Sequence, residues 1–186
     1  MATTELVIAG FGGQGILFLG EVLIRAAVIE GKNATWMPAY GPEQRGGTAT
    51  CTVVIADEPI GSPVVADPPV AIIMNRPSMD KFEPRVQPGG LLVVNTSMVD
   101  RPAERRDLRV IAVDAVREAT ALGEARAANM VVLGALLAAT AVVSPAAVRQ
   151  ALGELIPPEQ AKMLEVNLAA IRRGEEIAAA QVAVVA

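Results

Sequence analysis

The sequence predicts an α/β protein: a three-layer α/β/α sandwich with a largely parallel or mixed sheet, a Rossmann-like start and a helical C-terminal third. Three observations favour this fold class. Short apolar runs that suit buried strands alternate with helical periodicity, a glycine-rich turn follows the first run, and helical segments dominate after residue 114. Of the 186 residues, 52% are hydrophobic and 19% charged, so we expect a single domain, residues 1–186, with its own core.

A strand, a turn and a helix open the chain. Residues 6–9 form a short apolar run that predicts a buried strand, and residues 14–30 carry apolar side chains at helical spacing. Gly31 follows them in the position where glycine ends many helices. Residues 34–37 then predict a second strand.

A loop and a third strand come next. The prolines and glycines of residues 38–47 predict a loop, and the alternation over residues 48–56 predicts a strand with one more apolar face. Cys51 lies on that apolar face. We interpret it as a small core residue and not as a nucleophile.

The rest of the chain is predicted to alternate between strands and helices and then to become helical. The expected elements are strand 70–74, an irregular helix over 77–86, strands 91–95 and 109–113, and helices 115–122, 126–141, 145–155 and 158–179. Ser144 and Pro145 suit the start of a helix, because serine caps helix N-termini and proline fits the first helical position. Residues 181–186 are expected to form a loose tail or to dock on a partner.

The composition excludes several kinds of function. A net charge of −4 gives no basic surface for nucleic acid, and one cysteine cannot hold an iron–sulfur cluster or a cysteine-rich zinc site. The absence of histidine excludes histidine acid–base chemistry. We therefore expect no nucleic-acid partner, no metal ligands and no catalytic residue in this chain.

The N-terminal segment lacks the charged start and apolar centre of a signal peptide. The longest uninterrupted apolar run, residues 130–139, is about half as long as a membrane-spanning helix. A buried helix explains that run better than a membrane span does. We expect a cytoplasmic protein without a membrane partner.

The segment "AGFGGQGIL", residues 9–17, is the first candidate binding site. Its glycines fit the pattern G-x-G-x-x-G between a strand and a helix, where a tight turn leaves backbone N–H groups free to bind an anion. Dinucleotide binding would also require an acidic residue at the end of the second strand, but that segment reads "ATWMPAY". NAD binding is therefore disfavoured, and a tight turn that binds no ligand stays open as an alternative.

The segment "PAYGPEQRGG", residues 38–47, is the second candidate. Tyr40, Glu43, Gln44 and Arg45 place an aromatic ring, an acid, an amide and a cation close together, and arginine pairs well with carboxylates and phosphates. Because both candidate loops follow strands, we expect them to lie side by side at the carboxyl edge of the sheet. A surface loop in which Arg45 pairs with Glu43 is the alternative.

The two loops together resemble a known family. The segments "GFGGQGIL", "PAYGPEQRGGTATC", "PIGSPVV", "PGGLLVVN" and "ANMVVLGALL", in this order and spacing, are similar to the gamma subunit of 2-oxoacid:ferredoxin oxidoreductases, from about residue 5 to residue 174. The form "TWMPAYGPEQRGG" looks most like the subunits of 2-oxoglutarate enzymes. Subunits of branched-chain 2-oxoacid enzymes, the pyruvate/ketoisovalerate oxidoreductase type, come close behind, and those of indolepyruvate oxidoreductases resemble it less.

The resemblance implies a reaction that this chain shares with other subunits. A 2-oxoacid is decarboxylated on thiamine diphosphate, electrons leave one at a time through iron–sulfur clusters to ferredoxin, and the acyl group passes to coenzyme A. Alpha, beta and often delta subunits accompany the gamma subunit. This chain has no Gly-Asp-Gly thiamine diphosphate motif and one cysteine, so we expect neither cofactor on it alone.

The resemblance also implies where the partners and coenzyme A meet this chain. The two loops are expected near the active-site entrance of the complex, against the alpha and beta subunits and an anionic group such as the coenzyme A phosphates. The residues expected to bind there are Gly10, Gly12, Gly13, Gln14, Gly15, Tyr40, Arg45, Gly46 and Gly47. Asn129 and Asn167 also match the family pattern, and we interpret both as buried structural side chains that need hydrogen-bond partners.

Two further alternatives stay open. The chain could be a stand-alone nucleotide-binding or interaction module, or it could serve a branched-chain 2-oxoacid or indolepyruvate enzyme. An isolated gamma chain would expose its partner surface, so homodimer formation through that surface is also expected when the chain is alone.

Overall fold

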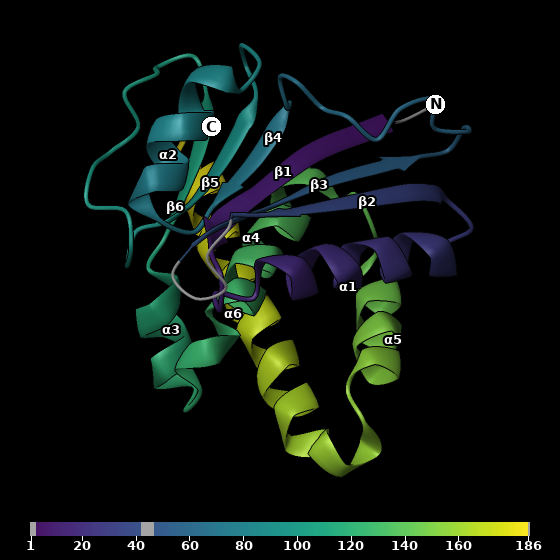
Figure 1. The fold of residues 1–186 in the computed structure, drawn as a ribbon. Coiled ribbons are helices and arrows are strands. Elements are labelled where there is room, and N and C mark those ends of the chain that lie inside the picture. The colour runs from purple at the N-terminus through teal and green to yellow at the C-terminus, as the bar shows by residue number, and fades with distance from the viewer. Residues whose placement is uncertain (1–2, 42–46, 186) are drawn as a thin grey trace.

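A mixed six-stranded sheet forms the centre of the computed structural model, which describes residues 3–41 and 47–185, with side chains described as far as Gln181 (Figure 1). The strand order is β2-β3-β1-β4-β5-β6. The strands are β1 (Thr3–Phe11), β2 (Asn33–Tyr40), β3 (Thr48–Ala56), β4 (Val70–Ile73), β5 (Leu91–Asn95) and β6 (Arg109–Val113). Strands β1, β4, β5 and β6 run parallel, whereas β3 is antiparallel to both of its neighbours.

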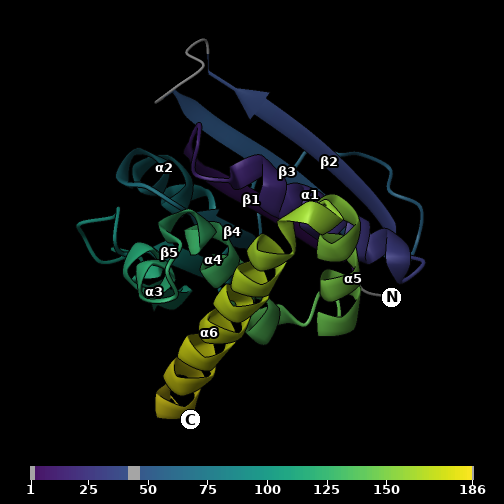
Figure 2. The same ribbon diagram turned by 90° about the horizontal axis from the view of Figure 1, so that it is seen from below.

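Helices cover both faces of this sheet, which confirms the predicted α/β fold class. They are α1 (Ile16–Ile29), α2 (Arg76–Phe82), α3 (Ala115–Ala121), α4 (Ala128–Thr140), α5 (Pro145–Leu155) and α6 (Ala161–Val185). Helices α1 and α4 pack on one face, with α5 and α6 packed against them, and α2 packs on the other face against β1 and β4 (Figures 1 and 2). Helices make up most of the chain after β6, as predicted.

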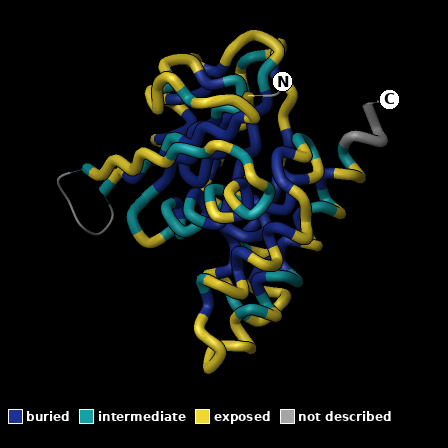
Figure 3. The backbone as a smooth tube through the Cα atoms, turned by 90° about the vertical axis from the view of Figure 1, so that its right-hand side faces the viewer, coloured by how far each residue is buried: buried dark blue, intermediate teal, exposed yellow. Residues whose placement is uncertain are grey.

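The two faces of the sheet correspond to two apolar cores. Along β1, Leu6 and Ile8 belong to the larger core under α1 and α4, whereas Val7 and Ala9 belong to the smaller core under α2. This division follows from the alternation of side chains along a strand. Buried residues are therefore concentrated in the sheet and in the helices packed on it, while the turn between α5 and α6 is exposed (Figure 3).

Strand β2 is longer than predicted and includes Tyr40, which we had placed in a loop. The reason lies in the hydrogen-bond register. The N–H of Gly41 donates to the carbonyl of Thr48 at 2.8 Å, so alternate residues before Gly41 face β3. Pro38 lies three residues before Gly41 and faces outward from this edge strand, where its missing N–H breaks no sheet hydrogen bond.

Helix α6 continues to Val185, whereas the sequence predicts a helix that ends at residue 179, with residues 181–186 as a loose tail or docked on a partner. Gln181 shows what holds this part of the helix. Its Oε1 accepts the N–H of Ala112 at 3.1 Å, and its Nε2 donates to the carbonyl of Ala112 at 2.7 Å. Ala112 lies in edge strand β6, so the glutamine amide satisfies backbone groups that a further strand would otherwise satisfy. The single-domain organisation stays a prediction.

Helices α4 and α6 cross at two glycines. A Cβ atom added to Gly134 would lie 1.9 Å from the carbonyl oxygen of Ile171, and one added to Gly174 would lie 1.8 Å from the carbonyl oxygen of Val131. Each helix thus places a glycine against the backbone of the other. This contact fixes the position of α6 against the buried helix α4.

Glu83, just after α2, anchors the loop that leads to β6. Its side chain is 3% exposed, and it pairs with Arg101 at 2.6 Å. Its other oxygen accepts the N–H groups of Glu104 at 2.5 Å and Arg105 at 3.0 Å. Burial raises the pKa of Glu83, but the Arg105 amide and the Arg101 guanidinium outweigh it and leave the pKa below the usual 4.5.

Glu83→Gln is expected to lower the free energy of unfolding at pH 7 by about 1–3 kcal/mol, because an amide cannot accept all the hydrogen bonds of the carboxylate. The folded-state pKa of Glu83 is lowered, so its contribution is present above pH 4.5 and is lost as the pH falls through the lowered value. Urea denaturation at pH 7 and at acidic pH should show the two proteins converging in acid. Glu104→Gln, at an exposed neighbour, should change stability little, and a difference that persists in acid would contradict the assignment.

Candidate functional site

The two predicted loops meet at one edge of the sheet. Strands β1 and β2 run in the same direction, so both end there, and the register places Phe11 opposite Thr48 and Tyr40 opposite Ala49. The N–H of Gly12 donates to the carbonyl of Gly47 at 2.9 Å, which joins the glycine loop to the end of the second loop. The expectation that these segments lie side by side is therefore confirmed for the described residues. Arg45 and Gly46 lie outside the described residues, as do Glu43 and Gln44.

Gln14 holds the glycine loop from inside. Its Oε1 accepts the N–H of Phe11 at 2.6 Å, and its Nε2 donates to the carbonyl of Met74 at 3.2 Å, just after β4. The side chain is therefore turned back over Gly10, where an added Cβ would lie 2.6 Å from the same Oε1. Gln14 positions the loop with both ends of its amide, a role that we had not predicted for it.

Gly15 begins α1 in a conformation that suits glycine. Its φ is +73°, in the left-handed region, and Asn129 from the start of α4 donates to its carbonyl at 3.2 Å. The prediction that Asn129 is a buried structural side chain with a hydrogen-bond partner is thus confirmed, and that partner is in the glycine loop. Asn167 is buried as predicted, but its side-chain amide forms no hydrogen bond with the described residues.

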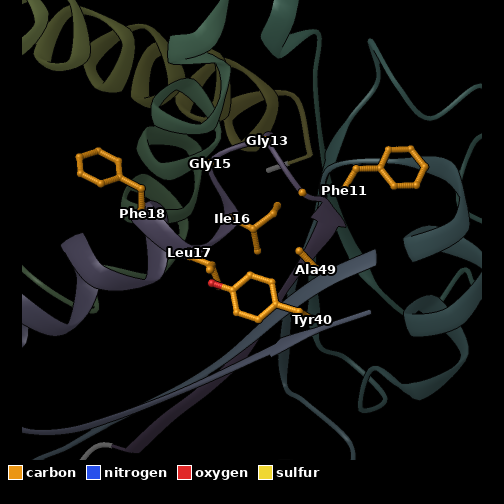
Figure 4. Close-up of a pocket in the computed structure, with 9 residues that line it drawn as sticks. Phe11, Gly13, Gly15, Ile16, Leu17, Phe18, Tyr40 and Ala49 are labelled. Carbon is orange, nitrogen blue, oxygen red and sulfur yellow. The ribbon is translucent and has the colours of Figure 1, made fainter. Parts of the chain in front are cut away.

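An open hollow of about 290 Å³ lies between the glycine loop and the end of β2. Its lining consists of Phe11, Gly12, Gly13, Gly15, Ile16, Leu17, Phe18, Tyr40 and Ala49. The ring of Tyr40 lies beside Ile16 and Leu17, whereas the rings of Phe11 and Phe18 point away from the Tyr40 ring (Figure 4). Tyr40 remains 68% exposed, so its ring is available to a ligand or a partner chain.

The first turn of α1 faces this hollow. In the described structure no side chain caps the helix, and no acidic residue lies in its first turn. Helix N-termini carry free N–H groups and a partial positive charge, so this end of α1 suits an anion. Gly13, with φ +96° and nothing within 4 Å of an added Cβ, leaves the loop backbone open on its outer side.

A second, smaller hollow of about 210 Å³ lies on the other side of the glycine loop, between Gly13, Met74 and the start of α4. Asn95, at the end of β5, forms part of its wall and is fully buried. Its Nδ2 donates to the carbonyl of Met74 at 3.5 Å, and its Oδ1 accepts the N–H of Ala115. Asn75 caps α2 through the N–H of Ser78 and donates to Gln14 at 3.4 Å.

Sequence reasoning missed these two asparagines. One available indication was the placement of each directly at or after a predicted strand, and for Asn75 also the proline two residues later, which is typical of a helix start. Asn75 donates directly to Gln14 of the glycine loop, and Asn95 donates to the same Met74 carbonyl that Gln14 contacts. They have hydrogen-bond partners within the chain, so they act as structural residues.

The sheet order argues against a dinucleotide site of the usual kind. In this chain β3 lies between β1 and β2, so the end of β2 is two strands away from the glycine loop. Two strand spacings amount to roughly 10 Å, and the end of β2 carries no acidic residue to bind ribose hydroxyls. Both facts agree with the disfavoured NAD interpretation.

Cys51 lies in the larger core, as predicted. Burial raises the pKa of its thiol to about 12, although a contact with Trp36 lowers it in part. A thiol with such a pKa stays protonated at neutral pH and is a poor nucleophile. Within the described ranges, no group of three or more His, Cys, Asp or Glu side chains is arranged to hold a metal ion. Nor does any helix in this part of the chain have the length and apolar character needed to cross a membrane.

Comparison with known proteins gives consistent results. Residues 5–177 match the profile of the pyruvate ferredoxin/flavodoxin oxidoreductase family. The chain is 47% identical over 131 residues to the ketoisovalerate oxidoreductase subunit VorA of Methanothermobacter marburgensis. The matched segment covers 70% of this chain and 27% of that protein. This chain therefore spans about a quarter of the VorA length.

Two other relatives match over nearly their whole length. The 2-oxoglutarate synthase subunit KorC of the same organism is 37% identical over 180 residues, which cover 93% of this chain and 95% of that protein. The crystal structure of the gamma subunit of a keto/oxoacid ferredoxin oxidoreductase from Geobacter sulfurreducens PCA has a TM-score of 0.80 at 30% identity. That match covers 95% of this chain and 99% of the other, and it confirms the fold.

Proposed function

Because the chain belongs to the pyruvate ferredoxin/flavodoxin oxidoreductase family, we propose that it is the gamma subunit of a multi-subunit 2-oxoacid:ferredoxin oxidoreductase. In the proposed reaction a 2-oxoacid loses carbon dioxide, its acyl group is transferred to coenzyme A, and its electrons pass singly to ferredoxin. The chain would work in the cytoplasm beside alpha, beta and often delta subunits. Its similarity to KorC over nearly the full length of both proteins supports this assignment.

Two of the cofactors implied by the family do not fit this chain. Iron–sulfur clusters require several cysteine ligands, and this chain has one cysteine, which is buried. The sequence contains no Gly-Asp-Gly motif for thiamine diphosphate. We therefore assign thiamine diphosphate and the clusters to the other subunits and no bond-making step to this chain.

Coenzyme A is the group that this chain fits. The described part of the site offers an open glycine loop and the uncapped start of α1, which suit a phosphate group. The hydrogen bond between Gly12 and Gly47 joins the glycine loop to the described end of the second loop, and it is the observation that carries the proposal. Arg45 lies two residues before Gly47 in the sequence, and we propose that it also contributes. The chain would bind and orient the coenzyme A phosphates while its partners carry out the chemistry.

2-Oxoglutarate is the proposed substrate, with a branched-chain 2-oxoacid as the second candidate. The first rests on KorC, which matches this chain over nearly its full length. The second rests on VorA, whose identity is higher over a shorter segment. Turnover of 2-oxoglutarate and of 2-oxoisovalerate by the purified complex distinguishes them.

Arg45→Ala is expected to raise the KM for coenzyme A by about 10–100-fold, the effect of losing charge-assisted hydrogen bonds to phosphate. The chain would be copurified with its thiamine-dependent subunits, and reduction of ferredoxin would be followed at varied coenzyme A. The KM for the 2-oxoacid should change little, because that substrate is expected on the other subunits.

Arg106→Ala serves as the matched control, since Arg106 is exposed and lies in the loop before β6, far from the carboxyl edge of the sheet. It should leave the KM for coenzyme A unchanged. If Arg45→Ala changes neither assembly nor coenzyme A dependence, the proposed role of the loop is wrong. Tight binding of NAD by the chain alone would favour a stand-alone nucleotide-binding module instead.

A further inference from the structure

An open hollow of about 660 Å³ lies at the opposite end of α1 from the glycine loop. Its walls come from two helices, a turn between helices and Glu30 just after α1. Leu137 and Ala138 belong to α4, Val143 and Ser144 to the turn that leads into α5, and Glu175 and Ala179 to α6. Apart from the serine and the glutamate, these side chains are apolar. The hollow therefore combines an apolar floor with two carboxylates, those of Glu30 and Glu175.

Glu175 is the unusual residue in this hollow. It is partly buried, and burial raises the pKa of its carboxyl group, with Arg172 lowering it only in part. The described residues give its carboxylate no hydrogen bond and no ion pair. A partly desolvated carboxylate whose charge is offset only in part by Arg172 is destabilising, so a cation placed beside it would be favourable.

The carboxylate of Glu30, which also lines the hollow, already has partners. It pairs with Lys32 at 2.9 Å and accepts the N–H of Ser144 at 2.6 Å. Burial raises the pKa of Glu30, but these hydrogen bonds outweigh it and leave the pKa lowered. Lys32 also donates to the carbonyl of Val142 at 2.7 Å, so it is committed to this side. The chain thus pairs the carboxylate of Glu30 directly and offsets that of Glu175 only in part, through Arg172.

The crossing of α4 and α6 holds the hollow in shape. Glu175 directly follows Gly174, whose backbone contacts Val131 of α4. Leu137 lies one turn beyond Gly134, the glycine at the other half of the same crossing. Because backbone packs on backbone there, neither wall can shift toward the other. The backbone that carries Glu175 is therefore held in place before any partner arrives.

We propose that this hollow receives an arginine or lysine side chain of a partner subunit. The alkyl part of that side chain would lie on the exposed Ala138 and Ala179, and its cationic head would pair with Glu175. The inference rests on the proposed function, because it takes the partner to be a subunit of the same complex. It adds a second contact with that complex, separate from the glycine loop and at the other end of α1.

The choice of occupant follows from charge and shape. The unsatisfied group is an anion, and the surface around it is apolar, so a cation on a long alkyl stem fits both features. A small inorganic cation would leave the apolar floor in water. An apolar segment without a cation would bury Glu175 further without a counter-ion.

Glu175→Lys tests this inference in the assembled complex. Repulsion would replace attraction, so the dissociation constant of this chain from its thiamine-binding subunits should rise by at least about tenfold at low salt. Glu175→Gln, which removes only the charge, should show a smaller loss that narrows at high salt. Glu159→Lys makes the same change of charge at an exposed residue after α5 and should leave assembly unchanged. Thermal unfolding of each isolated chain would confirm that all three fold.

The outcomes separate this inference from the proposed function. If the wild-type chain does not assemble with thiamine-binding subunits, both are wrong. If it assembles and Glu175→Lys assembles equally well, only the occupant of the hollow is wrong. A photo-crosslinker at Ala179 should join the chain to a partner peptide that contains arginine or lysine. A crosslink to a second copy of this chain would overturn the assignment to a partner subunit.

Discussion

Gly134→Ala is expected to lower the free energy of unfolding by about 2–4 kcal/mol, although alanine is the better helix former. The new Cβ would lie 1.9 Å from the carbonyl oxygen of Ile171 and 2.8 Å from its carbonyl carbon. Both are backbone atoms of α6, so the rotation of a side chain cannot relieve the clash. The two helices must move apart, and the core between them must open.

The loss should appear as a fall in the melting temperature of roughly 5–15 °C, followed by circular dichroism. Gly153→Ala is the matched control, because Gly153 lies within α5 and nothing lies within 4 Å of its added Cβ. That variant should be more stable by about 0.5–1 kcal/mol, since glycine in a helix costs conformational entropy. Equal stability of the two variants would contradict the close crossing.

Local patterns in the sequence predicted most of the fold because most of its elements depend on local periodicity. The apolar runs at β1, β4 and β5 and the glycine at position 31 were sufficient to locate strands and the end of α1. Tyr40 was misplaced because Pro38 suggested a loop. A proline is compatible with an edge strand when its nitrogen faces outward, and that depends on the register with β3, which no local pattern gives.

The length of α6 depends on a contact that is far away in the sequence. Gln181 binds the backbone of Ala112 across 69 residues, and a segment of alanines and valines gives no indication of it. The same holds for Gly134, which lies in an apolar run where a glycine looks like any small residue. Tertiary contacts of this kind are set by which helices meet, and only the structure shows that.

Some features of the candidate site were likewise predictable from the sequence, and others were not. The meeting of the two loops followed from the direction of the strands, and the contact between Gly12 and Gly47 confirms it. The inward turn of Gln14 was not predicted, because a glutamine in a glycine loop suits an exposed ligand contact equally well. The binding roles of the predicted site residues stay predictions, with Arg45 the residue to test first.

Gly15→Ala is expected to cost about 2–4 kcal/mol and to weaken coenzyme A binding in the proposed complex. The φ of +73° strains any residue with a Cβ, by about 1–2 kcal/mol. In addition, the Cβ would lie 2.3 Å from Nδ2 of Asn129, which must leave its hydrogen bond to the Gly15 carbonyl. Displacing Asn129 would shift the start of α1, where we place the phosphate.

Two further variants separate strain from the clash. Gly31 has the same φ of +73° and nothing within 4 Å of an added Cβ, so Gly31→Ala measures the strain alone. Asn129→Ala removes the group that Gly15→Ala would strike. If the clash matters, the double variant of Gly15 and Asn129 should lose less stability than the sum of the two single losses, as neighbouring sites that share a contact do. Additive losses would mean that Asn129 does not hold the glycine loop. A loss of coenzyme A affinity in Gly15→Ala but not in Gly31→Ala would then assign the effect to the loop itself, because both variants carry the same backbone strain.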